Sequence, residues 1–194
     1  MTRALVLYAH PVPESFGGAL HARVVETLQA RGWEVDDCDL YAEGFQPVLT
    51  PDERRGYHDL DHNTEPVQGH VDRLRAAEAL VLVFPVWNFG YPAILKGYLD
   101  RVFLPGISFV MEDGRPRGNL HNIRRLAAVT TYGADPFRAF LLGNPPKRSV
   151  TRHLRAVVHP KARSKYLALY GMNRATDADR RRFLDRVEAG MKAL

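Results

Sequence analysis

The sequence predicts an α/β fold, in which a doubly wound, five-stranded parallel sheet carries helices on both faces. Short apolar segments alternate about five times with segments whose apolar residues recur at helical spacing. This alternation is typical of a parallel sheet covered by helices. No internal repeat, low-complexity segment or linker interrupts the 194 residues. We therefore expect residues 1–194 to form a single domain, a length that suits one hydrophobic core.

The expected strands are short and rich in apolar residues, as buried parallel strands are. The clearest of them contains the run Ala-Leu-Val-Leu-Val-Phe, whereas the second alternates polar and apolar residues. In chain order, strands are expected at Arg3–Ala9, Trp33–Tyr41, Glu78–Pro85, Arg125–Thr131 and Lys165–Tyr170.

The expected helices are marked by an apolar stripe and by signals at their ends. Gly32 follows the first helix as a stop signal, and a proline occupies the first helical position of a capping box. In chain order, helices are expected at Phe16–Arg31, His70–Ala77 and Tyr91–Leu104, with the capping box at Thr50–Glu53 and a closing helix capped by Thr176. The segment Pro105–Asn122 is too long for a plain connection, so we expect a looped excursion such as a hairpin.

The composition is that of a soluble globular protein, with 45% hydrophobic and 25% charged residues. No apolar run reaches membrane-spanning length, so no integral membrane segment is expected. The single cysteine, Cys38, excludes an internal disulfide and a CxxC redox pair, and a cytoplasmic location is expected.

The net charge of +5 is unevenly distributed along the chain. Between Arg138 and Arg163 there are seven Lys or Arg residues and no Asp or Glu. Such a segment indicates either a phosphate-bearing ligand or acidic surface nearby, or simply a solvated loop and helix. Nucleic acid is not expected as a partner, because no aromatic-interleaved basic patch or recognised motif is present.

Three loops should leave the carboxyl edge of the sheet, where open parallel sheets bind their ligands. The first, His10–Leu20, places Ser15 and two glycines at the start of a helix. Free N–H groups and the helix dipole would make this an anion site, with His10 as a further donor. The alternative interpretation is that Ser15 is an N-cap and the glycines merely ease a turn.

The other two loops have the composition of a site for a flat ligand. Between Pro85 and Pro92 lie aromatic residues and unclaimed main-chain amides, which suit the face and the heteroatoms of a conjugated ring. The loop Thr130–Pro136 adds two hydroxyl groups and a glycine. A phosphate at the first loop and a planar ring between the other two describe a bound flavin mononucleotide. Neither GxGxxG nor GxxxxGK[ST] occurs, so a dinucleotide-binding fold of the usual type and a P-loop are not supported.

The segments "AHPVPESF", "FPVWNFGYPAILKGYLDRVF" and "TTYG" occur in this order. In these segments the chain resembles the flavodoxin-like NAD(P)H:quinone oxidoreductases, the family of DT-diaphorase, its modulator-of-drug-activity relatives and the potassium-efflux ancillary oxidoreductases. The resemblance covers the chain up to about Gly133.

The resemblance implies a homodimer with FMN or FAD at the subunit interface, which would also use the Pro105–Asn122 excursion. NAD(P)H would pass a hydride to the flavin, and from there to a quinone, azo or nitro compound in a ping-pong reaction. The expected cofactor-binding residues are His10, Ser15, Phe16, Gly17, Pro85, Val86, Trp87, Asn88, Phe89, Thr130, Thr131, Tyr132 and Gly133. The expected catalytic residues are Tyr132, Gly133 and Arg138.

Several positions depart from the family pattern. Phe109 and Met111 stand where DT-diaphorase has aromatic hydroxyls, and Arg138 and Asn144 fall near its Tyr/His pair. Arg138 could therefore stabilise an anionic reduced flavin directly. Tyr132 replaces the first glycine of a pair and is expected to cover part of the ring.

Two other interpretations remain. His58 and His62 are spaced i,i+4 with His70 beyond, a spacing that binds zinc on a helix, but no fourth ligand is indicated and no metal is expected. The chain could also be an electron carrier or an ancillary subunit without turnover of its own. Carriers with this fold tend to be acidic, whereas this chain has a pI near 9.5, which favours the enzyme.

Overall fold

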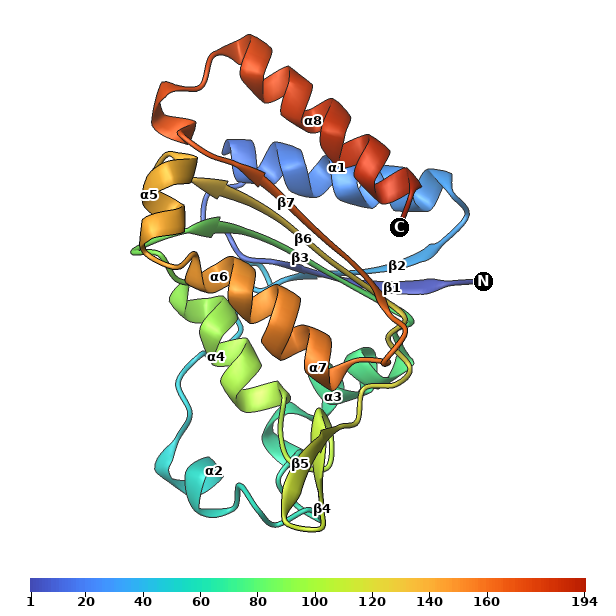
Figure 1. The fold of residues 1–194 in the computed structure, drawn as a ribbon. Helices are drawn as coiled ribbons and strands as arrows, with labels where there is room; N and C mark the ends of the chain where they lie inside the picture. Colours follow the sequence, from blue (N-terminus) through green and yellow to red (C-terminus); the bar gives the residue numbers. More distant parts are fainter.

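A five-stranded parallel sheet forms the centre of the computed structural model, which describes residues 1–194 (Figure 1). The strand order is β2-β1-β3-β6-β7, and every neighbouring pair is parallel. The strands are β1 (Arg3–Tyr8), β2 (Glu34–Asp39), β3 (Ala79–Val86), β6 (Arg125–Tyr132) and β7 (Arg163–Leu169). The order reverses between β1 and β3, which is where ligands bind in doubly wound sheets. The predicted fold class is confirmed.

Helices cover both faces of this sheet (Figure 1). One face carries α1 (Phe16–Ala30) and α8 (Asp177–Lys192), which lie side by side. The other face carries α3 (Gln68–Ala76), α4 (Ala93–Val102) and the segment that joins β6 to β7. That segment comprises α5 (Pro136–Leu141), α6 (Pro145–Arg148), a π-helical turn (Ser149–Leu154) and α7 (Arg155–Val157). No helix of the structure combines the length and the apolar character that crossing a membrane would require.

Each face of the sheet has its own hydrophobic core, because alternate residues of a strand point to opposite faces. In β1, Val6 belongs to the core of 15 buried residues under α1 and α8. Its neighbours Leu5 and Leu7 belong to the core of 29 buried residues on the other face. The central strands β1, β3 and β6 are thus buried on both faces, which explains why their sequences are rich in apolar residues, whereas the edge strand β2 is largely polar.

The excursion after α4 is a β-hairpin, as the sequence suggested. β4 (Phe109–Glu112) and β5 (Arg115–Gly118) pair antiparallel and are joined by Asp113 and Gly114. Both joining residues have positive φ, 51° and 71°. Asp-Gly is a favoured pair for a two-residue hairpin turn of this kind.

The predicted helix starts are confirmed by their side-chain contacts. The Thr50 hydroxyl accepts a hydrogen bond from the Glu53 N–H, the Glu53 carboxylate accepts one from the Thr50 N–H, and α2 (Pro51–Arg55) follows. Thr176 and Asp179 form the same reciprocal pair at the start of α8. These caps depend only on residues three apart, which is why they can be predicted locally.

Candidate functional site

The three loops that follow β1, β3 and β6 meet at the carboxyl edge of the sheet. The ring of His10, from the first loop, lies 5.9 Å from that of Trp87, from the second. Phe89 of the second loop lines a hollow of about 500 Å³ together with Gly133 and Arg138 of the third. The second loop therefore contacts both of the others.

In the first loop, the interpretation of Ser15 as an N-cap is confirmed. Its hydroxyl oxygen accepts a hydrogen bond from the Gly18 N–H at 3.1 Å. The Val12 N–H donates to Nδ1 of His10 at 3.0 Å, and the Ser15 hydroxyl lies 3.1 Å from the same nitrogen. Nδ1 is therefore an acceptor, which leaves the proton of the neutral ring on Nε2. Burial lowers the pKa of His10 and favours this neutral form.

The capping role of Ser15 leaves other donors of the helix start free. The N–H groups of Phe16 and Gly17 have no hydrogen-bond partner in the protein. Gly18 is the second of the two glycines expected at this helix start, and a Cβ atom there would overlap with the carbonyl oxygen of Pro13. Glycine thus lets the chain fold tightly around the free N–H groups, and an anion can approach them.

The second loop is a tight turn from Trp87 to Gly90. The Gly90 N–H donates to the Trp87 carbonyl oxygen at 2.8 Å, and the Trp87 N–H donates back to Gly90 at 3.3 Å. Asn88 and Phe89 have φ values of 49° and 54°, so the turn is of type I′. A phenylalanine in the left-handed region is uncommon, and such backbone conformations cluster at functional sites. The turn leaves the N–H groups of Asn88 and Phe89 without protein partners.

The third loop brings Arg138 to the rim. Asp135 caps α5 by accepting a hydrogen bond from the Arg138 N–H at 2.9 Å. This bond, followed by the charge of the guanidinium group, holds the pKa of Asp135 below its usual value. The Arg138 side chain is exposed and lies 3.5 Å from the Asp135 carboxylate. Its positive charge therefore reaches the hollow, but an adjacent carboxylate partly balances it.

The side chain of Tyr132 does not cover a ring at the rim, contrary to the expectation from the sequence. It is only 1% exposed, and its hydroxyl donates to Oδ1 of Asn144 at 2.6 Å. Its hydroxyl also lies 2.5 Å from that of Tyr166, and its ring stacks on Tyr170 at 4.5 Å. Burial raises the pKa of Tyr132. Tyr132 can thus contact a ligand at the edge only through its main chain.

Two further predicted residues are also turned inward. Thr130 is fully buried, and its hydroxyl has no hydrogen-bond partner. Pro85 is buried within β3. The residues at or near the rim with exposed or half-buried side chains are His10, Ser15, Phe16, Val86, Trp87, Asn88, Phe89, Thr131 and Arg138.

A second hollow, between the third loop and the start of α8, was not predicted from the sequence. It measures about 570 Å³ and is lined by Arg174, Arg182 and Arg186 as well as by Phe183. The ring of Phe183, from α8, lies 6.4 Å from that of Phe16, at the start of α1. Arg182 and Arg186 are four residues apart on α8, Arg174 lies in the 3₁₀ turn that precedes this helix, and the lining also includes Asp135 and Asp179.

The comparisons with known proteins agree with this geometry. A family described as having a flavodoxin-like fold matches residues 2–189, and the chain belongs to that family. The rat NAD(P)H dehydrogenase [quinone] 1 is 32% identical over 148 residues, which are 68% of this chain and 54% of that protein. An uncharacterized NAD(P)H oxidoreductase of Haemophilus influenzae is 35% identical over 139 residues, which are 70% of this chain and 68% of that protein. The resemblance that the three segments indicated is therefore confirmed, although the matched part spans only about half of the rat protein.

Solved structures confirm the fold. Smu.1420 from Streptococcus mutans UA159 has a TM-score of 0.84 at 26% identity, with 100% of both chains covered. An NAD(P)H:quinone oxidoreductase from Methanothermobacter marburgensis has a TM-score of 0.83 at 24% identity, with 98% of both chains covered.

Proposed function

We propose that this chain is a flavin-dependent NAD(P)H oxidoreductase that reduces quinones or related small acceptors such as azo and nitro compounds. The observation that carries the proposal is the meeting of three loops at one edge of the sheet. Their aromatic side chains suit a flat ligand, and their unpaired N–H groups suit an anionic one. The quinone reductases among its relatives support the same reaction class.

The residues of the rim have distinct roles in this proposal. The N–H groups of Phe16 and Gly17, with Nε2 of His10, would hold the flavin phosphate. Trp87 and Phe89 would border the ring, and the free N–H groups of Asn88 and Phe89 would donate to its heteroatoms. When bound, the flavin supplies the chemistry, which is the acceptance and donation of a hydride. The protein binds and orients it, and Arg138 contributes positive charge near the ring.

The choice between FMN and FAD depends on the hollow beside Phe183. An FMN phosphate would be held by the first loop alone. The diphosphate and adenine of FAD would extend into the hollow, where three arginines against the carboxylates of Asp135 and Asp179 leave an excess of one positive charge. The mass of the cofactor released by heating distinguishes the two.

The alternative of an electron carrier or ancillary subunit is less well supported. The hollow lined by Phe89, Gly133 and Arg138 leaves about 500 Å³ beside the ring position, enough for a small acceptor. A carrier has no need of such a space. We also propose a cytoplasmic location, where NAD(P)H is supplied.

We further propose that the enzyme is a homodimer that covers α5. Phe137, Phe140, Leu141 and Leu142 are 68, 76, 63 and 56% exposed. Four large apolar side chains in one short segment are unusual on a monomer and typical of an interface. Leu141 and Leu142 also line the hollow, so a partner there would help to enclose the acceptor.

Purification and steady-state assay test the proposed activity. We expect a yellow protein that oxidises NADH or NADPH when menadione is added, with parallel lines in a ping-pong analysis. A yellow protein without turnover would instead indicate the carrier or ancillary subunit. A colourless protein that does not bind added flavin would contradict both.

A further inference from the structure

Three potential metal ligands that the proposed redox site does not use meet at the β2 edge of the sheet, where Cys38 is buried, His70 is half-buried and Glu43 is exposed. Cys38 lies in β2, Glu43 in the turn that follows it, and His70 in α3. One ligand atom from each, a sulfur, an oxygen and a nitrogen, lies within 4.8 Å of the other two. Only the packing of α3 against the end of β2 creates this group.

Buried polar atoms without partners surround this group. Nδ1 of His70 is enclosed and makes no hydrogen bond. The ring of His70 packs against Tyr98 at 5.4 Å, and Tyr98 is fully buried with an unpaired hydroxyl. Cys38 is also fully buried, and its only side-chain hydrogen bond is the weak one from Sγ to Oε2 of Glu43 at 3.6 Å. Because buried polar groups are almost always paired, these atoms are available to bond a ligand.

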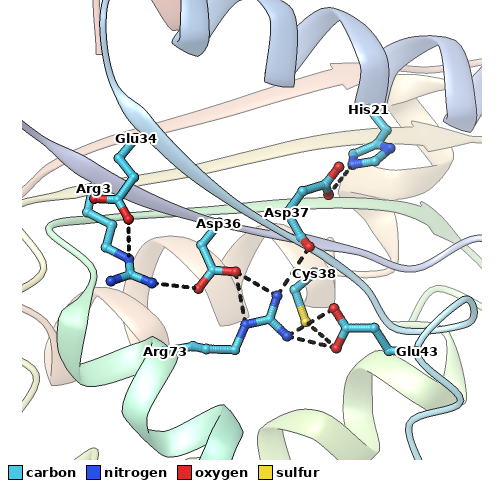
Figure 2. A network of polar contacts seen from close by, with 8 residues as sticks. All are labelled: Arg3, His21, Glu34, Asp36, Asp37, Cys38, Glu43 and Arg73. Carbon is cyan, nitrogen blue, oxygen red and sulfur yellow. Dashed lines mark hydrogen bonds and ion pairs between the residues drawn. The ribbon is translucent and has the colours of Figure 1, made fainter.

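An arginine fixes the position of the carboxylate in this group. Figure 2 shows Arg73 between Asp36 and Glu43, with its guanidinium nitrogens 2.7 Å from each carboxylate. The same guanidinium group donates to both oxygens of Glu43, to Oε1 at 2.9 Å and to Oε2 at 2.7 Å, and so balances part of the negative charge there. Each carboxylate oxygen has two lone pairs, so Glu43 can accept from Arg73 and still bind a metal. Hydrogen-bond donors such as the Arg73 guanidinium group commonly orient the carboxylate ligands of metal sites.

We propose that Cys38, Glu43 and His70 form a zinc site. Thiolate, imidazole and carboxylate together are the ligand set of Zn²⁺, whereas Mg²⁺ and Ca²⁺ prefer oxygen alone. The metal displaces the thiol proton, which leaves to solvent, and lies between Sγ of Cys38 and Oε2 of Glu43. Tetrahedral bonds to zinc separate ligand atoms by roughly 3.6 Å, so the three side chains close in slightly on binding. A water molecule completes the coordination.

Metal content and X-ray absorption test the site directly. The full-length protein is equilibrated with Zn²⁺, freed of excess metal by gel filtration, and analysed for zinc. We expect one zinc per chain with a single sulfur ligand at about 2.3 Å. Neither measurement depends on flavin or on turnover, so the outcome is independent of the proposed oxidoreductase function.

Matched variants locate the ligands. Cys38→Ser and His70→Gln should each weaken zinc binding at least tenfold, whereas His62→Gln should leave it unchanged, because His62 is exposed and hydrogen-bonded to Glu65. Circular dichroism verifies that each variant is folded. If the Cys38→Ser variant does not fold, the Cys38→Ala variant is used in its place. Absence of stoichiometric zinc, a coordination sphere without sulfur, or retention of zinc by folded Cys38 and His70 variants would overturn the proposal.

Discussion

Tyr132 and Asn144 together fix the two ends of the segment that carries Arg138. Tyr132 ends β6, and Asn144 precedes α6 in the left-handed conformation, with φ of 45°. The amide of Asn144 accepts from the Tyr132 hydroxyl at 2.6 Å and donates to the Tyr170 hydroxyl at 2.9 Å. Both ends of the Asn144 amide are thus hydrogen-bonded to side chains of the protein, and these bonds hold α5 in place.

We predict that Tyr132→Phe destabilises the protein by about 1–3 kcal/mol, because it leaves buried partners of the hydroxyl unpaired. The free energy of unfolding in urea measures the effect. Tyr41→Phe is the control, since Tyr41 is 37% exposed and its hydroxyl makes no hydrogen bond, and it should change little. Equal stabilities of the two variants would show that the hydroxyl network does not stabilise the fold.

At the scale of an element, α5 is short and presents its apolar residues outward. Ala139 is its only buried residue. A helix that turns large apolar side chains to solvent lacks the usual stripe of apolar residues facing the core. Burial of these side chains against a partner would stabilise the helix and remove the apolar surface from water.

For the proposed dimer, we predict that the unaltered protein sediments as a dimer and that Phe140→Asp combined with Leu141→Asp sediments as a monomer, because charged side chains cannot be buried without partners. Sedimentation velocity measures the change. Val48→Asp, at a position that is 71% exposed elsewhere on the surface, should leave the dimer intact. A double variant that still sediments as a dimer would place the interface on another face.

The elements that could be predicted are those determined by local residues. The caps at Thr50 and Thr176 and the Asp113-Gly114 turn depend on neighbours in the sequence. The helical turns between Pro145 and Val157 were not predicted, because they are stabilised by the burial of Val150 and Leu154 in the core rather than by local signals.

The same distinction applies to the site. The convergence of the loops at one edge follows from the parallel direction of the strands, which the alternation of strands and helices already indicated. The inward orientation of Tyr132 could not be predicted, because its partner Tyr166 lies on the neighbouring strand β7. The left-handed conformation of Phe89 could not be predicted either, since phenylalanine rarely adopts it.

At the scale of the whole molecule, two hydrophobic cores hold the sheet rigidly from both sides, and the three loops extend from its carboxyl edge. This arrangement leaves the loop backbone free to bind a ligand, because the strands and helices behind it already provide stability. The flavin would therefore enter a largely preformed site next to Trp87.

Fluorescence of Trp87 tests this claim most directly. The chain has two tryptophans, so a Trp33→Phe variant leaves Trp87 as the sole emitter. We predict that titration of its flavin-free form with FMN quenches this emission strongly and saturates at one flavin per chain, because the ring stacks close to the indole. Stoichiometric binding of FMN with unchanged Trp87 emission, or no binding at all, would contradict the account.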